Sequence, residues 1–197
     1  LQLLGINYIW KTFIIMKTLK RSITVLVCLI LFTSCTKSID YNKEKSYIEK
    51  KKGITYYKGT PFTGEIFENY ENGQLDYKEN FKDGKQDGLY ESYYKNGQLG
   101  SKANYKDGKK DGLYESYYEN GQLDYKENFK DGKKDGLYEL YYKNGQLWYK
   151  ANYKDGKQDG LLEEYYENGQ LKSKINTKLG IVDGLSEFYD ENGKRMD

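Results

Sequence analysis

The chain has 197 residues, with 32 Lys and Arg against 30 Asp and Glu, no His, one Pro, two Cys and 23 Tyr. The mean hydropathy of −0.96 leaves too little Leu, Ile and Val for a large aliphatic core, and much of the apolar content is instead aromatic. Without His, neither a Ser-His or Cys-His catalytic pair nor a His-ligated metal site can form.

The first 35 residues have the order of features typical of a secretion signal. Met16 is followed by a basic segment and then by about ten apolar residues, too few to span a bilayer as a stable helix. The basic residues are Lys17, Lys20 and Arg21. We therefore predict a signal peptide at residues 16–34, with a buried helix as the alternative.

Small residues directly precede Cys35, in the sequence Leu-Phe-Thr-Ser-Cys, which resembles the lipobox of bacterial lipoproteins. The resemblance implies that cleavage leaves Cys35 as the first residue, with a lipid attached. We predict an extracytoplasmic, membrane-anchored lipoprotein in the periplasm or at the cell surface. Residues 1–15 are predicted to come from a misassigned start codon. Residues 35–52, which are polar and rich in Lys, are predicted to form a tether.

Removal of the leader changes the charge balance. The leader contains four of the 32 basic residues and no acidic residue, so 28 basic and 30 acidic residues remain, for a net charge of −2. A nucleic-acid partner, which requires a basic surface, is therefore not expected. Cys28 leaves with the leader and Cys35 is acylated, so we expect no disulfide in the mature chain.

From residue 64 onward the sequence repeats every 24 residues. The units open at Gly64, Gly88, Gly112, Gly136, Gly160 and Gly184. A constant period in this range is typical of repeat architectures, in which each unit packs on its neighbours.

Each full unit contains two turn signals. Asn-Gly, as in Asn96-Gly97, predicts a tight hairpin in which both residues adopt positive φ. Asp-Gly-Lys-x-Asp-Gly, as at 107–112, predicts a second reversal that is looser and longer. About six or seven residues lie between the two signals, which is the usual length of a strand.

The side chains between the turns alternate as they do in strands. In the second strand, the odd-numbered residues of 99–105 are predicted to share one face and the even-numbered residues the other. In the first strand, Tyr90 and Tyr94 are predicted to share a face, and Leu89 and Tyr93 the other. We therefore expect one face to be more polar than the other.

These patterns predict an all-β fold over residues 53–197. The expected architecture is a single, coiled and elongated antiparallel meander of 24-residue β-hairpin repeats with about 11–13 strands. Residues 53–64 are predicted to be an altered half-unit in which Pro61 protects an edge. Cross-strand tyrosine contacts are expected to replace the missing aliphatic core.

The repeat pattern supports a family resemblance. Gly-x-Tyr-x-x-Tyr-Tyr-x-Asn-Gly-x-Leu, followed by Tyr-x-Asp-Gly-Lys, resembles the bacterial MORN-repeat variant found in YwqK-family antitoxins, over about residues 53–197. The resemblance implies a MORN-like scaffold that binds a protein partner and is not an enzyme. The antitoxin label implies neutralisation of a toxin by direct contact, and the anchor implies an immunity-like protein held at a membrane.

Paired tyrosines recur in the first strand of the units, and we predict that one tyrosine of each pair belongs to a partner-binding surface. That surface comprises Tyr94, Tyr118, Tyr142, Tyr166 and Trp148. Packing within the sheet is the alternative role of these rings. Aromatic hairpins are also similar to cell-wall choline- and glucan-binding repeats, so carbohydrate or peptidoglycan binding is the alternative function. Those repeats depend on Trp, and Trp148 is the single Trp after the leader.

Three further patterns bear on chemistry. The acidic loops, such as 107–112, place Lys between the Asp residues, which favours turns over calcium sites, so neither metal nor cofactor is expected.

One Lys per unit is predicted to lie on a solvated face balanced by Glu on adjacent strands; a strip for anionic lipid or glycan is the alternative. The rows are Lys78, Lys102, Lys126, Lys150 and Lys174 against Glu91, Glu115, Glu139 and Glu163. Because an open ribbon offers no converging acid, base or nucleophile, we predict no catalysis.

Overall fold

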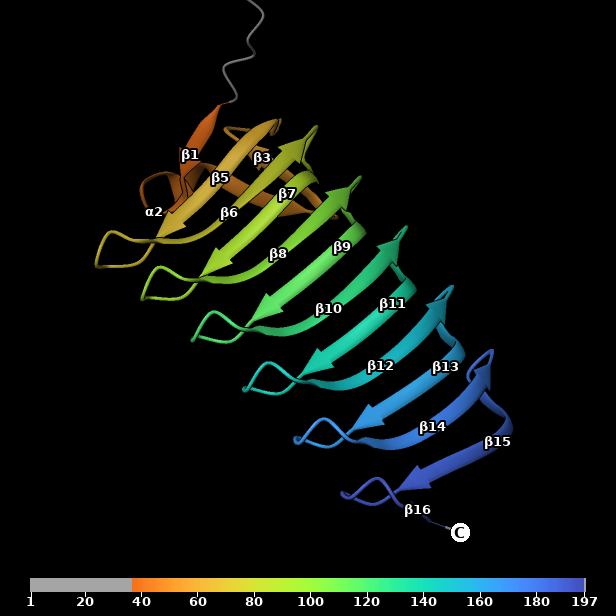
Figure 1. Cartoon of the computed structure of the whole chain (residues 1–197). Helices are drawn as coiled ribbons and strands as arrows, with labels where there is room; N and C mark the ends of the chain where they lie inside the picture. The colour runs from red at the N-terminus through yellow and green to blue at the C-terminus, as the bar shows by residue number, and fades with distance from the viewer. Residues whose placement is uncertain (1–36, 197) are drawn as a thin grey trace, which may run out of the picture. The chain divides into compact units, whose positions relative to one another are not determined.

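The computed structural model describes residues 37–196, and most of them lie in one long sheet (Figure 1). The sheet has 13 strands in the order β1, then β5 to β16, so that from β5 onward each strand pairs with its neighbour in the sequence. All the pairs from β5 to β16 are antiparallel. The predicted all-β meander of hairpin repeats is therefore confirmed.

The repeat strands have nearly constant lengths. Their bounds are β5 Gly64–Asn69, β6 Leu75–Lys82, β7 Lys85–Tyr93, β8 Leu99–Lys106, β9 Lys109–Tyr117, β10 Leu123–Lys130, β11 Lys133–Tyr141, β12 Leu147–Lys154, β13 Lys157–Tyr165, β14 Leu171–Lys178, β15 Ile181–Tyr189 and β16 Arg195–Met196. Most therefore have eight or nine residues, longer than the six or seven expected from the turn spacing. The extra length comes from residues of the predicted turn at 107–112, most of which lie in strands.

The structure exchanges the two predicted turn types. The tight hairpin is at Asp-Gly: Asp107 and Gly108 have φ of 50° and 81° and form the two-residue link between β8 and β9. At the Asn-Gly loops only the glycine has positive φ, as in Gly97 at 84°. Asn96 instead accepts a hydrogen bond from the N–H of Gln98 at 2.9 Å, which closes a wider loop between β7 and β8. The prediction of tight Asn-Gly turns was wrong because the Asn side chain closes the loop by accepting a hydrogen bond, and the Asn backbone does not adopt a positive φ.

The two faces of the sheet differ in chemistry. The tyrosine face is the face carrying the cross-strand row Tyr90, Ala103, Tyr114, Glu127, Tyr138, Ala151 and Leu162. The opposite face is the ladder face. A register shift places Leu99 opposite Tyr93 while Ser101 lies opposite Ser92, so the strict alternation predicted for 99–105 fails at Leu99.

The ladder face carries a continuous row of alternating charge. Cross-strand register runs through Lys78, Glu91, Lys102, Glu115, Lys126, Glu139, Lys150, Glu163, Lys174 and Glu187. The Nζ of Lys78 and of Lys102 lies 2.6 Å from its Glu partner, and hydrogen bonding to that Glu raises the lysine pKa. The Lys row is therefore paired with Glu on adjacent strands, as predicted.

The N-terminal segment is folded, contrary to the predicted tether at 35–52. Its elements are β1 Ser38–Asp40, α2 Tyr41–Glu44, a 3₁₀ turn Lys45–Tyr47, β2 Ile48–Lys51, β3 Ile54–Tyr57 and β4 Thr60–Pro61. β1 pairs with β5 in parallel, and β2, β3 and β4 form a separate three-stranded sheet. Pro61 lies on an edge strand of this small sheet rather than in a half-unit of the repeat.

The small sheet covers the tyrosine face at its N-terminal end. Its Tyr57 and Phe62 stack edge-on, and Phe62 in turn contacts Phe81 of β6, with centroids 6.0 Å apart in each pair. Ile39 and Ile66, at 3% and 2% exposure, complete this cluster of buried apolar side chains. The described chain therefore concentrates its buried apolar side chains at this end, and the later repeats depend on half-buried rings.

Candidate functional site

The small sheet lies at the N-terminal end of the long sheet and leaves the tyrosine face of the later repeats uncovered within the described residues (Figure 1). The rings of the tyrosine face form a connected series across four strands. Tyr114 stacks on Tyr125 with centroids 5.3 Å apart, Tyr125 lies 6.4 Å from Tyr138, and Tyr138 lies 5.9 Å from Tyr149. The distances are within the range of favourable aromatic pairs, so the rings hold one another in place.

Two lysines lie within this aromatic surface. Lys110 Nζ is 3.8 Å from the ring centroid of Tyr114 and 4.9 Å from that of Phe129. Lys134 Nζ is 4.2 Å from the Tyr138 centroid and makes an ion pair with Glu127 Oε2 at 2.7 Å. The surface therefore combines ring faces with cations held over them.

Four phenols of this surface have a raised pKa and are protonated at neutral pH. Burial is the largest cause that raises the pKa of Tyr90, Tyr105 and Tyr138, and it raises the pKa of Tyr149 to about 12. Each hydroxyl is thus a neutral donor and acceptor. A partner would meet a surface that is apolar over the rings and polar at their edges.

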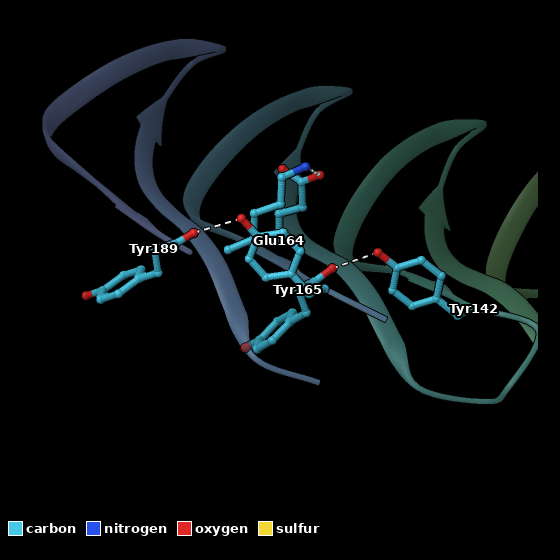
Figure 2. Close-up of polar contacts among 6 residues, drawn as sticks. Tyr142, Glu164, Tyr165 and Tyr189 are labelled. Carbon is cyan, nitrogen blue, oxygen red and sulfur yellow. Dashed lines mark hydrogen bonds and ion pairs between the residues drawn. The ribbon is translucent and has the colours of Figure 1, made fainter. Parts of the chain in front are cut away.

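The tyrosines predicted to bind a partner form a row beside the Asn-Gly loops and join successive repeats. Each donates its hydroxyl to a backbone carbonyl of the next unit, 23 residues later. Figure 2 shows this bond from Tyr142 to the carbonyl of Tyr165, at 2.8 Å, and an equivalent bond to the carbonyl of Tyr189. The hydroxyls of Tyr94, Tyr118, Tyr142 and Tyr166 are therefore used within the fold. Their ring faces stay half-buried, so a contact role for the rings remains a prediction.

The loops add a second bond between repeats. Asn96 donates through its side chain to the carbonyl of Glu119 at 3.1 Å, and Asn144 donates to Glu167 at 3.2 Å. In the last unit Asp190 takes the position of the joining tyrosine and accepts from the N–H of Asn192 and Lys194. The side chain that joins one repeat to the next is thus replaced in the last described unit.

Trp148 lies against the row of joining tyrosines. Its ring is 5.8 Å from Tyr142, and 41% of the residue is exposed. The equivalent position holds Gly100 in one unit and Asp124 in another, so the fold does not require a ring there. Trp148 is therefore the predicted site residue that is most available to a partner.

Several residues of this surface were not predicted. Glu127, at 6% exposure, and Lys134 become partners only because a register shift between Glu127 and Phe129 places them together. The sequence carries no clear signal for this pair, because the equivalent Glu79 is followed seven residues later by Gln86, and Lys110 follows Ala103 at the same spacing. Predicted lipid attachment at Cys35 lies outside the described residues.

No helix within residues 37–196 is long and apolar enough to cross a membrane. The same residues contain no group of three or more Cys, Asp or Glu side chains placed to hold a metal ion.

Comparison with known families agrees with the repeat geometry. The family described as MORN repeat variant matches at residues 62–83, 86–107, 110–131, 134–155, 158–179 and 182–196. The chain belongs to the MORN repeat variant family. The first four matches to the MORN repeat variant end at the Asp of an Asp-Gly turn, and the fifth ends at Leu179 of the equivalent Leu-Gly turn. The family unit therefore corresponds to one β-hairpin of the sheet.

Other comparisons add little to the family assignment. Among curated proteins there is no match. A solved structure of an S. aureus TarM mutant, in complex with Fondaparinux, alpha-GlcNAc-glycerol and UDP, has 11% identity and a TM-score of 0.30. The match covers 60% of this chain and 22% of that chain. At this TM-score the likeness supports no argument about fold or ligand.

Glu79 on the tyrosine face is expected to weaken the fold at neutral pH. Burial raises its pKa, against the hydrogen bond from Gln86 and the charge of Lys50. Because the folded pKa is above the unfolded value, stability is greatest below the unfolded pKa and falls as pH rises through the folded pKa. Glu79→Gln should raise the Tm by about 2–4 °C at pH 7, with the difference vanishing near pH 4.

Thermal melts of the two proteins across this pH range measure the effect. Glu71→Gln, which alters an exposed carboxylate, is the matched control and should leave the Tm unchanged at both pH values. A Glu79→Gln variant less stable than the wild type at pH 7 would show that the carboxylate contributes to stability in its ionised form.

Proposed function

We propose that this protein is a membrane-anchored, non-catalytic scaffold that binds a protein partner through its tyrosine face, with toxin neutralisation as its specific role. The observation that most directly supports this proposal is the connected series of rings from Tyr114 to Tyr149, which no other part of the described chain covers. Tyr is enriched at the centres of protein interfaces because one ring supplies a large apolar area and a polar edge.

The construction of the repeats supports rigid recognition. The hydrogen bonds from the Tyr hydroxyls and from the Asn side chains recur at equivalent positions between units, so they hold each repeat against the next in the same way. A surface ordered before binding loses little conformational entropy on association, which improves affinity. The MORN repeat variant scaffold thus presents its rings in a fixed array.

The membrane anchor is a separate part of the proposal. It rests on the leader sequence and on Cys35, and a lipid there would restrict the scaffold to partners on the outer side of a membrane. Cys35→Ser should move the protein from the membrane fraction to the soluble fraction. Equal membrane association of the Cys35→Ser protein, with no lipid on either form, would contradict the anchor and leave the binding surface untouched.

The binding role is tested by affinity capture from cell envelope with the full chain in detergent, using purified peptidoglycan as a second bait. Tyr125→Ser and Tyr138→Leu remove two rings by introducing the residues that stand at the equivalent positions Ser101 and Leu162. Because the fold already accepts those residues, the double variant should fold while losing at least tenfold in affinity for the purified partner.

Leu113→Lys is the control on the ladder face, where Leu113 is 37% exposed. It should bind the partner as the wild type does. A partner held equally well by the Tyr125→Ser, Tyr138→Leu variant would place binding elsewhere on the chain. Sedimentation with peptidoglycan that free sugar competes away would support the carbohydrate alternative and contradict the proposal.

A further inference from the structure

The small sheet shows how an extended segment binds to the tyrosine face in the first unit. Its strand β3 lies at the Asp-Gly turn between β6 and β7, where Thr55 N–H donates to Gly84 O at 2.7 Å. Ile54 Cγ2 fills the place that a Cβ at Gly84 would take, and Thr55 is 5% exposed. The turn thus offers a bound strand one carbonyl oxygen and the space beside a glycine.

An aromatic ring and a charged side chain complete this first docking place. Phe81 of β6 is 7% exposed and contacts Phe62, which follows β4. Glu79 of β6 and Lys50 of β2 line the same cavity between the two sheets. Burial raises the pKa of Glu79, and the charge of Lys50 opposes that rise. The small sheet therefore brings a cation to an acid of the face that it covers.

The next unit carries the same parts with no strand of the described chain docked on them. Gly108, with φ of 81°, is the turn residue equivalent to Gly84, and Tyr105 is equivalent to Phe81. A Cβ at Gly108 would meet only Lys85 Cβ within 4 Å, at 3.9 Å, so the space that a side chain fills in the first unit is open. Within residues 37–196, no backbone N–H donates to Gly108 O.

The charge at this second docking place is reversed. Ala103 stands where the first unit has Glu79, and Lys110 stands where it has Gln86. An acid has thus been lost and a cation gained at nearby positions of the same face. A segment bound here would therefore need an acidic side chain where the small sheet carries Lys50.

Lys110 is available to such an acid. Its Nζ lies 3.8 Å from the ring centroid of Tyr114, and none of the ion pairs in residues 37–196 includes it. At the equivalent positions of the next two units, Lys134 is paired with Glu127 and Gln158 is uncharged. The charge that a partner can use is thus found at one repeat and not all along the face.

We propose that Gly108, Tyr105 and Lys110 form a docking place for an extended segment of the protein partner, which binds as β3 binds at Gly84. The segment donates an N–H to Gly108 O, covers the ring of Tyr105 with apolar side chains, and places a Glu or Asp beside Lys110. A helix fits this site less well, because most of its N–H groups are already bonded within it. The inference rests on the binding role proposed above and specifies the chemistry of the partner.

A peptide copied from the small sheet is the probe. It has the sequence of residues 47–62 with Lys50→Glu, and a disulfide between positions 49 and 56, which are cross-strand partners, holds β2 on β3. Fluorescence anisotropy measures its binding to the full chain in detergent. The Lys50→Glu peptide should bind saturably and at least tenfold more tightly than the peptide that keeps Lys50. An N-methyl group on the Thr55 amide should abolish binding, since it removes the donor to Gly108 O.

A charge exchange in the protein tests the same contact from the other side. Ala103→Glu with Lys110→Gln reproduces Glu79 and Gln86 of the first unit, so the fold should accept both residues. This variant should reverse the preference and bind the Lys50 peptide at least tenfold more tightly than the Lys50→Glu peptide.

The matched control changes the equivalent positions one unit later. Glu127→Ala with Lys134→Gln should leave the preference of the wild type unchanged. Amide hydrogen exchange should show protection of residues 105–110 by the Lys50→Glu peptide.

Four results would each overturn the docking place: no saturable binding, binding that survives N-methylation, a preference that does not reverse, or protection confined to other repeats. Capture of an envelope protein that depends on Tyr125 and Tyr138 would then still support the binding role of the face. Failure of that capture, together with specific peptide binding, would contradict the proposed binding role and support the docking place.

Discussion

Gly84→Ala is expected to lower the free energy of unfolding by about 3 kcal/mol, because the added methyl meets backbone that cannot move away. Gly84 has φ of 80° in the turn between β6 and β7. Its Cβ would lie 2.4 Å from Ile54 Cγ2 and 2.8 Å from the carbonyl oxygen of Thr55. The variant should therefore separate the small sheet from the first repeat.

One backbone bond distinguishes the Gly84 turn from its copies: Gly84 O accepts from Thr55 N–H of β3 at 2.7 Å. The bond from Gly84 N–H to Phe62 O, also 2.7 Å, recurs in the other turns, as from Gly108 N–H to Gln86 O. The turn is thus the point at which the small sheet is fixed to the long one. Urea unfolding followed by circular dichroism measures the loss, with hydrogen exchange of β3 reporting local separation.

Gly156→Ala provides the matched control. Gly156 has φ of 86° in the same kind of turn, and nothing lies within 4 Å of its added Cβ. This variant should lose about 1 kcal/mol, the cost of an unfavourable φ alone. Equal losses in the two variants would show that the contact with the small sheet contributes nothing to stability.

Lys134→Met is expected to destabilise the fold by about 2 kcal/mol, because it leaves the carboxylate of Glu127 buried without its cation. Glu127 is 6% exposed, and Lys134 Nζ is 2.7 Å from its Oε2. Burial lowers the pKa of Lys134, but the hydrogen bond and charge of Glu127 outweigh it and raise the pKa overall. The Lys134 side chain is itself 37% exposed, so the loss should be smaller than for a fully buried pair.

A double variant taken from the next repeat removes both charges of the ion pair at once, so that neither charge is left unpaired. Glu127→Ala with Lys134→Gln reproduces Ala151 and Gln158, which stand at the equivalent places one unit later. This double variant should unfold within about 0.5 kcal/mol of the wild type in urea. If the double variant is as unstable as Lys134→Met, the loss comes from the lysine stem packed on Tyr138 and not from the orphaned charge.

The N-terminal cap shows where sequence reasoning failed. Residues 38–61 do not repeat, and their strands have two to four residues, too short for an alternating pattern to emerge. β1 also pairs in parallel with a strand that begins 26 residues after it, and no local signal predicts such a pairing. Only the burial of Ile39 against Ile66 and Phe81 shows why this Lys-rich segment folds.

The binding surface could be predicted in part. Composition and period identified the recurring tyrosines, and Trp148 was singled out as the single Trp after the leader. The hydroxyl bond from Tyr118 to the Tyr141 carbonyl joins residues 23 apart, so it exists only once the units are stacked. The meeting of Glu127 with Lys134 depends likewise on a register shift that hydrophobic patterning does not reveal.

The sequence by itself determined the repeat length, the strand–turn order and the use of tyrosine in place of an aliphatic core, because these depend on local propensity and on period-two alternation. Only the tertiary structure decided which turn is tight, which residues face one another across strands, and where the small sheet packs on the long one. Those features depend on inter-strand register, and register is set by contacts between residues far apart in the chain.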